Sequence, residues 1–180
     1  MGYCGGRKQN PTYRSLGDHS ETVQLDFDPA VVSYEDLLRI FWSDHDPISQ
    51  PYSRQYASII FYHDAEQEAV AVATKAREEK ERRVKLSTEI APFSDFWLAE
   101  DYHQKYYLRG SELMREFRRM YSINGDFVNS TAAARVNGYL GGYGTVASLR
   151  QEIDSLGLLD AGKQALLETV RARHGERVLR

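Results

Sequence analysis

The alternation of strand-like and helix-like periodicity over the N-terminal half most constrains what this chain can fold into. Residues 23–28, VQLDFD, alternate apolar and polar side chains, which predicts a half-buried strand that ends at Pro29. Ser33 and Asp36 have the spacing of an acidic capping box, in which each side chain accepts a hydrogen bond from the other residue's backbone amide. The apolar residues of 34–42 fall on one helical face, so we expect a helix that packs on a sheet.

A second series of the same kind follows. Residues 55–62, QYASIIFY, are rich in β-branched and aromatic side chains and predict a strand. Asp64 is the expected N-cap of a helix over 65–83, and a short strand is expected over 87–91. The order strand, helix, strand, helix, strand predicts an α/β fold, an α+β sandwich of two layers, with right-handed crossovers where strands are parallel.

The pattern changes near residue 110, which predicts a domain over 1–109 followed by a helical extension over 110–180. Helices are expected in the extension at 112–121, 151–158 and 161–173. The glycine-rich stretch NGYLGGYG, residues 137–144, lacks the ending and the spacing of a phosphate-binding loop. We expect it to be a packing turn whose tyrosines are wedged between helices.

Composition and charge argue against several classes of protein. A net charge of −3 over 180 residues gives no electrostatic argument for a nucleic-acid partner. No apolar run approaches the roughly 20 residues that span a bilayer, and no signal peptide is recognised, so the cytoplasm is the expected location. A single cysteine makes neither an internal disulfide nor a cysteine-rich metal site, and His45, His63 and His103 lack the spacing of metal ligands.

Cys4, the single cysteine, is the first candidate for chemistry. Gly5 permits an open turn beside it, and Arg7 and Lys8 bring positive charge nearby, which favours a reactive thiolate. The alternative is a small residue that fills space at the end of a strand, and the local sequence leaves both interpretations open.

His19 and Glu21 form the second candidate. Residues two apart in an extended segment lie on the same face, so both side chains are expected to point into one site. Glu21 directly precedes an apolar segment, a position that buries its carboxyl in part and favours the protonated form that a general acid needs. The alternative is a solvent-facing carboxylate at a strand end.

Several motifs together resemble the S-form peptide methionine sulfoxide reductases. They occur in family order and at family-like spacing: GYCGG (2–6), NPTY (10–13), GDHSETV (17–23), DFDP (26–29), SYEDLL (33–38), FWSDHDP (41–47), QYASIIFYH (55–63) and TEIAPFSDFWLAEDYHQKY (88–106). The resemblance implies a ferredoxin-like reductase core, with the residues after 110 as the extension of an atypical branch.

The resemblance also implies an oxidoreductase that reduces methionine sulfoxide in oxidised proteins or as the free amino acid. A cysteine thiolate attacks the sulfoxide sulfur while an acid protonates the oxygen, and further thiols return the resulting sulfenic acid to the thiol. By position, Glu21 is the expected acid, and the hydroxyls of Tyr13 and Tyr56 are expected to hydrogen-bond the sulfoxide oxygen. The resemblance implies an external reductant such as thioredoxin. It implies no bound cofactor, metal, nucleic acid or membrane.

Two departures from the family pattern bear on activity. The family nucleophile lies in a Gly-Cys-Phe-Trp motif on a strand-to-helix turn upstream of GYCGG, and that motif is absent from these 180 residues. Pro51 stands roughly where family members carry an aspartate in a longer loop. Cys4 aligns with the glycine turn, so it does not inherit the role of nucleophile, and the domain over 1–109 is expected to lack its first strand and helix.

Three hypotheses follow from these departures. The first is a reductase whose nucleophile segment lies ahead of residue 1, so that this chain is inactive alone. The second is a non-catalytic relative that binds methionine sulfoxide or a protein partner. In the third, Cys4 substitutes as the thiol.

Overall fold

A computed structural model describes residues 1–178, with side chains described up to residue 173. The chain divides into two compact units, Met1–Glu100 and Asp101–Arg180. Residues 101–109, which the sequence pattern grouped with the first domain, thus belong to the second unit. Within the described part of the chain, no helix has the length and apolar character needed to cross a membrane.

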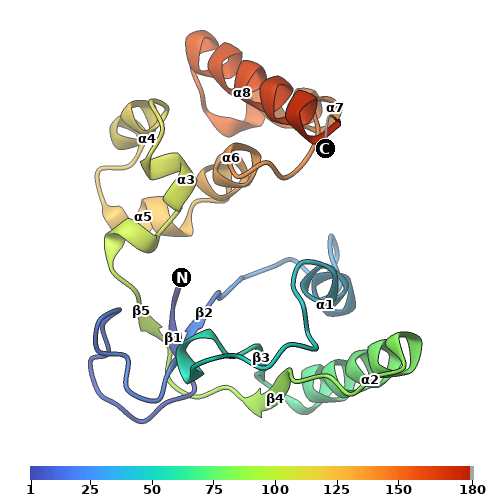
Figure 1. The fold of residues 1–180 in the computed structure, drawn as a ribbon. Helices are drawn as coiled ribbons and strands as arrows, with labels where there is room; N and C mark the ends of the chain where they lie inside the picture. Colours follow the sequence, from blue (N-terminus) through green and yellow to red (C-terminus); the bar gives the residue numbers. More distant parts are fainter. Residues whose placement is uncertain (179–180) are drawn as a thin grey trace. The chain divides into compact units, whose positions relative to one another are not determined.

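The first unit contains a three-stranded antiparallel sheet at the start of the chain (Figure 1). Its central strand is β1 (Gly2–Cys4), which pairs on one side with β2 (Ser20–Thr22) and on the other with β5 (Trp97–Leu98). Tyr3 lies opposite Glu21 in this register. The short strands therefore bring the two ends of the unit's sequence together.

A second sheet consists of two parallel strands, β3 (Ile59–Tyr62) and β4 (Glu89–Pro92). Parallel strands need a long crossover, and α2 (Ala65–Arg82) provides it. Helix α1 (Tyr34–Ser43) packs against α2. The mixed α/β class predicted from the periodicity is confirmed.

The strand predicted over 23–28 is wrong. Strand pairing ends at Thr22, and none of the described strands pairs with the residues that follow. Val23 and Leu25 are 58% and 62% exposed. Alternation of apolar and polar residues favours a strand, but a strand also needs a neighbour to take up its backbone hydrogen bonds. This segment has the pattern without the partner.

The strand predicted over 55–62 is shorter than expected, because Arg54–Tyr56 form a 3₁₀ turn, η1, and β3 begins only at Ile59. The helix predicted over 65–83 is confirmed. Asp64 caps it by accepting a hydrogen bond of 2.8 Å from the backbone amide of Gln67.

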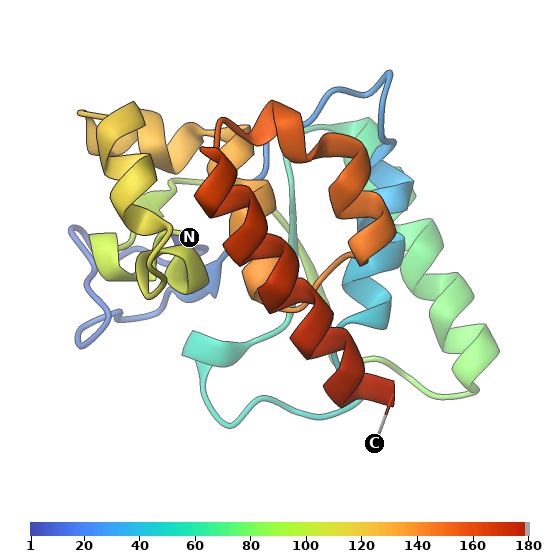
Figure 2. The same cartoon turned by 90° about the horizontal axis from the view of Figure 1, so that it is seen from above.

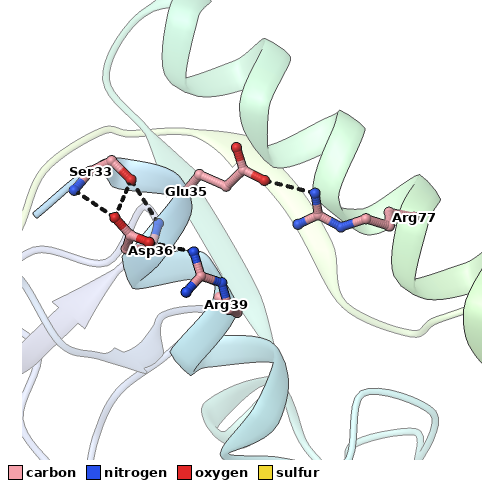
Figure 3. Close-up of polar contacts among 5 residues, drawn as sticks. All are labelled: Ser33, Glu35, Asp36, Arg39 and Arg77. Atoms are coloured by element: carbon pink, nitrogen blue, oxygen red, sulfur yellow. Dashed lines mark hydrogen bonds and ion pairs between the residues drawn. The ribbon is translucent and has the colours of Figure 1, made fainter.

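The capping box at the start of α1 is confirmed (Figure 3). The Ser33 hydroxyl accepts from the Asp36 amide at 3.1 Å, and the Asp36 carboxylate accepts from the Ser33 amide at 3.1 Å. Asp36 also pairs with Arg39, and Glu35 pairs with Arg77 of α2 at 2.7 Å. These contacts fix where α1 begins and tie it to α2.

Replacement of Ser33 by alanine is expected to lower the free energy of unfolding by about 1 kcal/mol, because the Asp36 amide loses its partner. Urea denaturation followed by circular dichroism measures the loss. Ser43→Ala is the matched control, since the Ser43 hydroxyl donates to the Ile40 carbonyl and caps no amide. Equal stability of the two variants would contradict the capping role.

The core of the first unit lies between its two longer helices and the parallel sheet. Its buried side chains are Leu38 and Trp42 from α1, Ile60 from β3, Ala71 from α2 and Leu86 from the loop before β4. Trp42 is 1% exposed.

The second unit is helical (Figure 2). Its described helices are η2 (Asp101–His103), α3 (Tyr106–Arg109), α4 (Met114–Met120), α5 (Asn124–Asn129), α6 (Thr131–Leu140), α7 (Val146–Glu152), η3 (Ile153–Leu156) and α8 (Asp160–Val178). The three predicted helices occur with shifted ends. Helices α5 and α6 were not predicted, although the buried residues of α6, Ala133, Val136 and Leu140, have helical spacing.

The stretch NGYLGGYG is only in part a turn. Residues 137–140 form the last turn of α6, and the glycines that follow leave the helix, with Gly142 at φ +90° and Gly144 at φ +78°. Tyr139 is buried, and its hydroxyl donates to Glu152 at 2.5 Å. Tyr143 is 52% exposed. The prediction of wedged tyrosines therefore holds for Tyr139 and fails for Tyr143.

Candidate functional site

The glycine turn after β1 is built around His19. The His19 Nδ1 accepts from the Gly6 amide at 3.1 Å, and its Nε2 donates to the Lys8 carbonyl at 2.8 Å. A Cβ at Gly6 would come within 2.7 Å of this ring, so only glycine fits. His19 is 1% exposed and has both nitrogens engaged. The prediction that it shares a site with Glu21 is wrong, because strand β2 begins only at Ser20 and His19 belongs to the turn.

Cys4 lies inside the antiparallel sheet. It pairs with Ser20 and has no exposed area. A nucleophilic thiol must meet its substrate, and this one is covered on every side. Its burial corresponds to the space-filling interpretation of the sequence.

Tyr13, Glu21 and Tyr56 belong to one chain of polar contacts. The hydroxyls of Tyr13 and Tyr56 lie 3.4 Å apart. The amide nitrogen of Gln55 donates to the Glu21 carboxylate at 2.7 Å and also to the Tyr56 hydroxyl at 3.2 Å. Three segments far apart in the sequence thus place two hydroxyls and one carboxyl in a connected group, which we call the hydroxyl–carboxyl cluster (Tyr13, Glu21, Gln55 and Tyr56).

Gln55 is the member that the sequence pattern did not single out. It is half-buried and hydrogen-bonds both Glu21 and Tyr56, which fixes the orientation of these two side chains. Gln55 directly precedes Tyr56 in the sequence, but a glutamine next to a tyrosine does not by itself indicate a functional site. Only the turn η1, which directs the side chain back toward β2, gives it a role.

Backbone contacts hold the cluster in place. The Tyr13 amide donates to Glu100 at 3.1 Å, and the same carboxylate accepts from the Tyr3 hydroxyl at 2.6 Å. The Ser20 hydroxyl donates to the Arg54 carbonyl at 2.6 Å, which ties β2 to η1 next to Glu21. Tyr13 and Tyr56 are nevertheless 37% and 42% exposed, so a ligand can reach them.

The hydroxyl of Tyr56 is held in its protonated form. Hydrogen bonding with Tyr13, and then with Tyr52, raises the pKa of Tyr56 above its usual value. A tyrosine that keeps its proton at neutral pH can donate a hydrogen bond to an anionic or strongly polarised oxygen. The cluster therefore suits a ligand that presents such an oxygen.

An apolar groove of about 390 Å³ adjoins the cluster. It is lined by β2, by the unpaired segment after it, by α1 and by β3, and Glu21 forms part of its wall. Among the described strands, β2 pairs only with β1, and β3 pairs only with β4, so each has one unpaired edge. Two unpaired strand edges thus contribute to the lining of one groove.

One residue of the groove lining carries a buried polar atom. The hydroxyl of Tyr34, a residue of the lining, is shielded from solvent, and no described residue hydrogen-bonds it. Burial, and then the Asp64 carboxylate, raise the pKa of Tyr34. Among the described residues, no group of three or more histidines, cysteines or carboxylates could hold a metal ion.

Comparison with known proteins places this geometry in a family. A family model described as peptide methionine sulfoxide reductase matches residues 1–135, and one described as the helical domain of selenoprotein methionine sulfoxide reductase A matches residues 124–168. A peptide methionine sulfoxide reductase of Drosophila melanogaster is 39% identical over 180 residues, which cover 98% of this chain and 72% of the fly protein.

Two further likenesses agree. The peptide methionine sulfoxide reductase MsrA of Methanosarcina acetivorans is 41% identical over 133 residues, covering 66% of this chain and 71% of that protein. A crystal structure of Mxr1 from Saccharomyces cerevisiae in reduced form matches with a TM-score of 0.56 and 26% identity, covering 61% of this chain and 68% of that one. The fold is of the mixed α/β class and matches that of Mxr1. The chain belongs to the peptide methionine sulfoxide reductase family.

Proposed function

We propose that this chain provides the oxygen-binding part of a methionine S-sulfoxide reductase and works with a thiol from outside the described residues. The observation that carries the proposal is the hydroxyl–carboxyl cluster, in which two tyrosyl hydroxyls and the Glu21 carboxyl are joined through Gln55. A sulfoxide oxygen is strongly polarised and accepts hydrogen bonds from such hydroxyls.

The reaction assigns each group a part. A thiolate attacks the sulfoxide sulfur while Glu21, in its protonated form, transfers a proton to the oxygen. Methionine leaves with its sulfur reduced by two electrons, and the thiol sulfur takes the oxygen and becomes a sulfenic acid. A second thiol, from a donor such as thioredoxin, condenses with the sulfenic acid to a disulfide and releases water.

The apolar groove supports the proposal that the attacking thiol arrives on an added strand. A strand between β2 and β3 would satisfy both unpaired edges and cover apolar residues of the lining. It would also pass beside Glu21, which lies in the groove wall. Cys4 does not serve in this scheme, because its thiol is buried.

Genomic sequence ahead of Met1 tests the source of that strand. In-frame codons for Gly-Cys-Phe-Trp support the proposal. So does the same motif with UGA in place of the cysteine codon, because the family model matched by residues 124–168 is that of a selenoprotein. A selenol would then take the part of the thiol. Absence of both motifs favours the alternative, a non-catalytic relative that binds methionine sulfoxide.

Binding of the substrate tests the cluster directly. We expect N-acetyl-methionine-S-sulfoxide amide to shift the NMR signals of residues around Tyr13 and Tyr56, and the R epimer to shift them less. Tyr13→Phe and Tyr56→Phe should each cost about 0.5–1.5 kcal/mol of binding free energy, the contribution of one hydrogen bond. Tyr143→Phe, an exposed tyrosine of the second unit, is the control. Equal binding by all variants would refute the proposed role of the cluster.

A further inference from the structure

The ring of Tyr52 is the most exposed large apolar group beside the hydroxyl–carboxyl cluster. It is 85% exposed, and its centroid lies 5.0 Å from that of Tyr56 with the planes tilted by 36°. In water such a ring contributes little to folding, since it buries little apolar area. Its hydroxyl hydrogen-bonds Tyr56, and its exposed ring face can be covered by a ligand that already contacts Tyr56.

The loop that carries Tyr52 is held at both ends. On one side, Ser87 donates its amide to the Pro47 carbonyl at 2.8 Å and its hydroxyl to the Ser49 carbonyl at 2.8 Å. On the other side, the Tyr56 amide donates to the Ser53 carbonyl at 3.2 Å and closes the turn η1. Anchoring a ring before binding reduces the entropy lost when a ligand packs on it.

The spacing suits a polypeptide ligand. A methionine sulfoxide whose oxygen contacts the hydroxyls of Tyr13 and Tyr56 is followed by a residue whose Cα lies about 3.8 Å from its own. The ring of Tyr52 lies 5.0 Å from that of Tyr56. The side chain of a neighbouring residue can therefore reach the face of Tyr52. The free amino acid has charged amino and carboxylate groups at those positions and nothing to stack.

We propose that Tyr52 is a specificity-determining residue that packs against an apolar or aromatic side chain next to methionine sulfoxide in a polypeptide. The substrate class is thus peptide-bound methionine sulfoxide with such a neighbour, in preference to the free amino acid. The inference rests on the proposed function, because it takes the sulfoxide oxygen to lie at the tyrosyl hydroxyls.

The test compares two blocked dipeptides, acetyl-Phe-methionine-S-sulfoxide amide and its Gly analogue, by calorimetric titration of the full chain. We expect the Phe peptide to bind roughly 3- to 10-fold more tightly, the range for one aromatic pair. Tyr52→Ala should abolish this ratio, and loss of its hydrogen bond to Tyr56 should weaken the binding of both peptides to the same extent apart from that. Tyr52→Phe should retain the ratio, and so should Tyr143→Ala, the matched exposed tyrosine.

The outcomes separate this inference from the proposed function. A ratio that survives in Tyr52→Ala overturns the inference, and so does an equal loss for both peptides, which would mean that Tyr52 acts only through Tyr56. Tyr13→Phe should weaken both peptides equally with the ratio intact. If the wild-type chain binds the sulfoxide peptides no better than the same peptides with unoxidised methionine, the proposed function fails and this inference fails with it.

Discussion

Reduction of methionine S-sulfoxide by dithiothreitol is expected to be undetectable with residues 1–180 and to appear once a strand bearing Gly-Cys-Phe-Trp is joined ahead of Met1. The unmodified chain has the hydroxyl–carboxyl cluster but no accessible thiol, because its single cysteine, Cys4, has no exposed area. Cys4→Ser should leave the activity unchanged, both in residues 1–180 and in the protein extended ahead of Met1. Thiol-dependent turnover by the unmodified chain that is lost in Cys4→Ser would instead assign the nucleophile to Cys4.

In the extended protein, Glu21→Gln is expected to lower the turnover number by roughly 10²-fold or more, because a glutamine cannot supply the proton to the sulfoxide oxygen. The glutamine amide can still contact Gln55, so the fold should be kept. Glu35→Gln is the matched control, an exposed carboxylate whose partner is Arg77. An unchanged rate in Glu21→Gln would remove Glu21 from the role of acid.

Phe117→Ala is expected to have the largest effect on stability, a loss of about 3–5 kcal/mol in the free energy of unfolding. Phe117 has no exposed area and lies among the rings of Tyr121 and Phe127 and the side chains of α6 in the core of the second unit. Removal of the ring leaves a cavity that short helices cannot close without moving.

Denaturation of this variant, followed by the helical signal in circular dichroism, measures the loss. Ile123→Ala is the control, because Ile123 is 62% exposed and its truncation should change stability by less than about 0.5 kcal/mol. A loss below about 1 kcal/mol for Phe117→Ala would mean that the second unit does not depend on this core.

Features that depend on local sequence were predicted correctly. The capping box of Ser33 and Asp36, the N-cap Asp64 and the apolar face of α1 all depend on residues within one or two helical turns. The family resemblance also named Tyr13, Glu21 and Tyr56, whose roles stay predictions although the fold brings them into one cluster.

Features that depend on distant partners were decided by the tertiary structure. Residues 23–28 alternate like a strand but have no strand beside them, and Gln55 has a role only because η1 lies next to β2. His19 looked like a partner of Glu21 and instead holds the glycine turn. The sequence by itself determined the two long helices of the first unit, their N-caps and the class of fold. Which residues face one another was set by hydrogen bonds and packing between segments far apart in the chain, and those contacts leave no local periodicity.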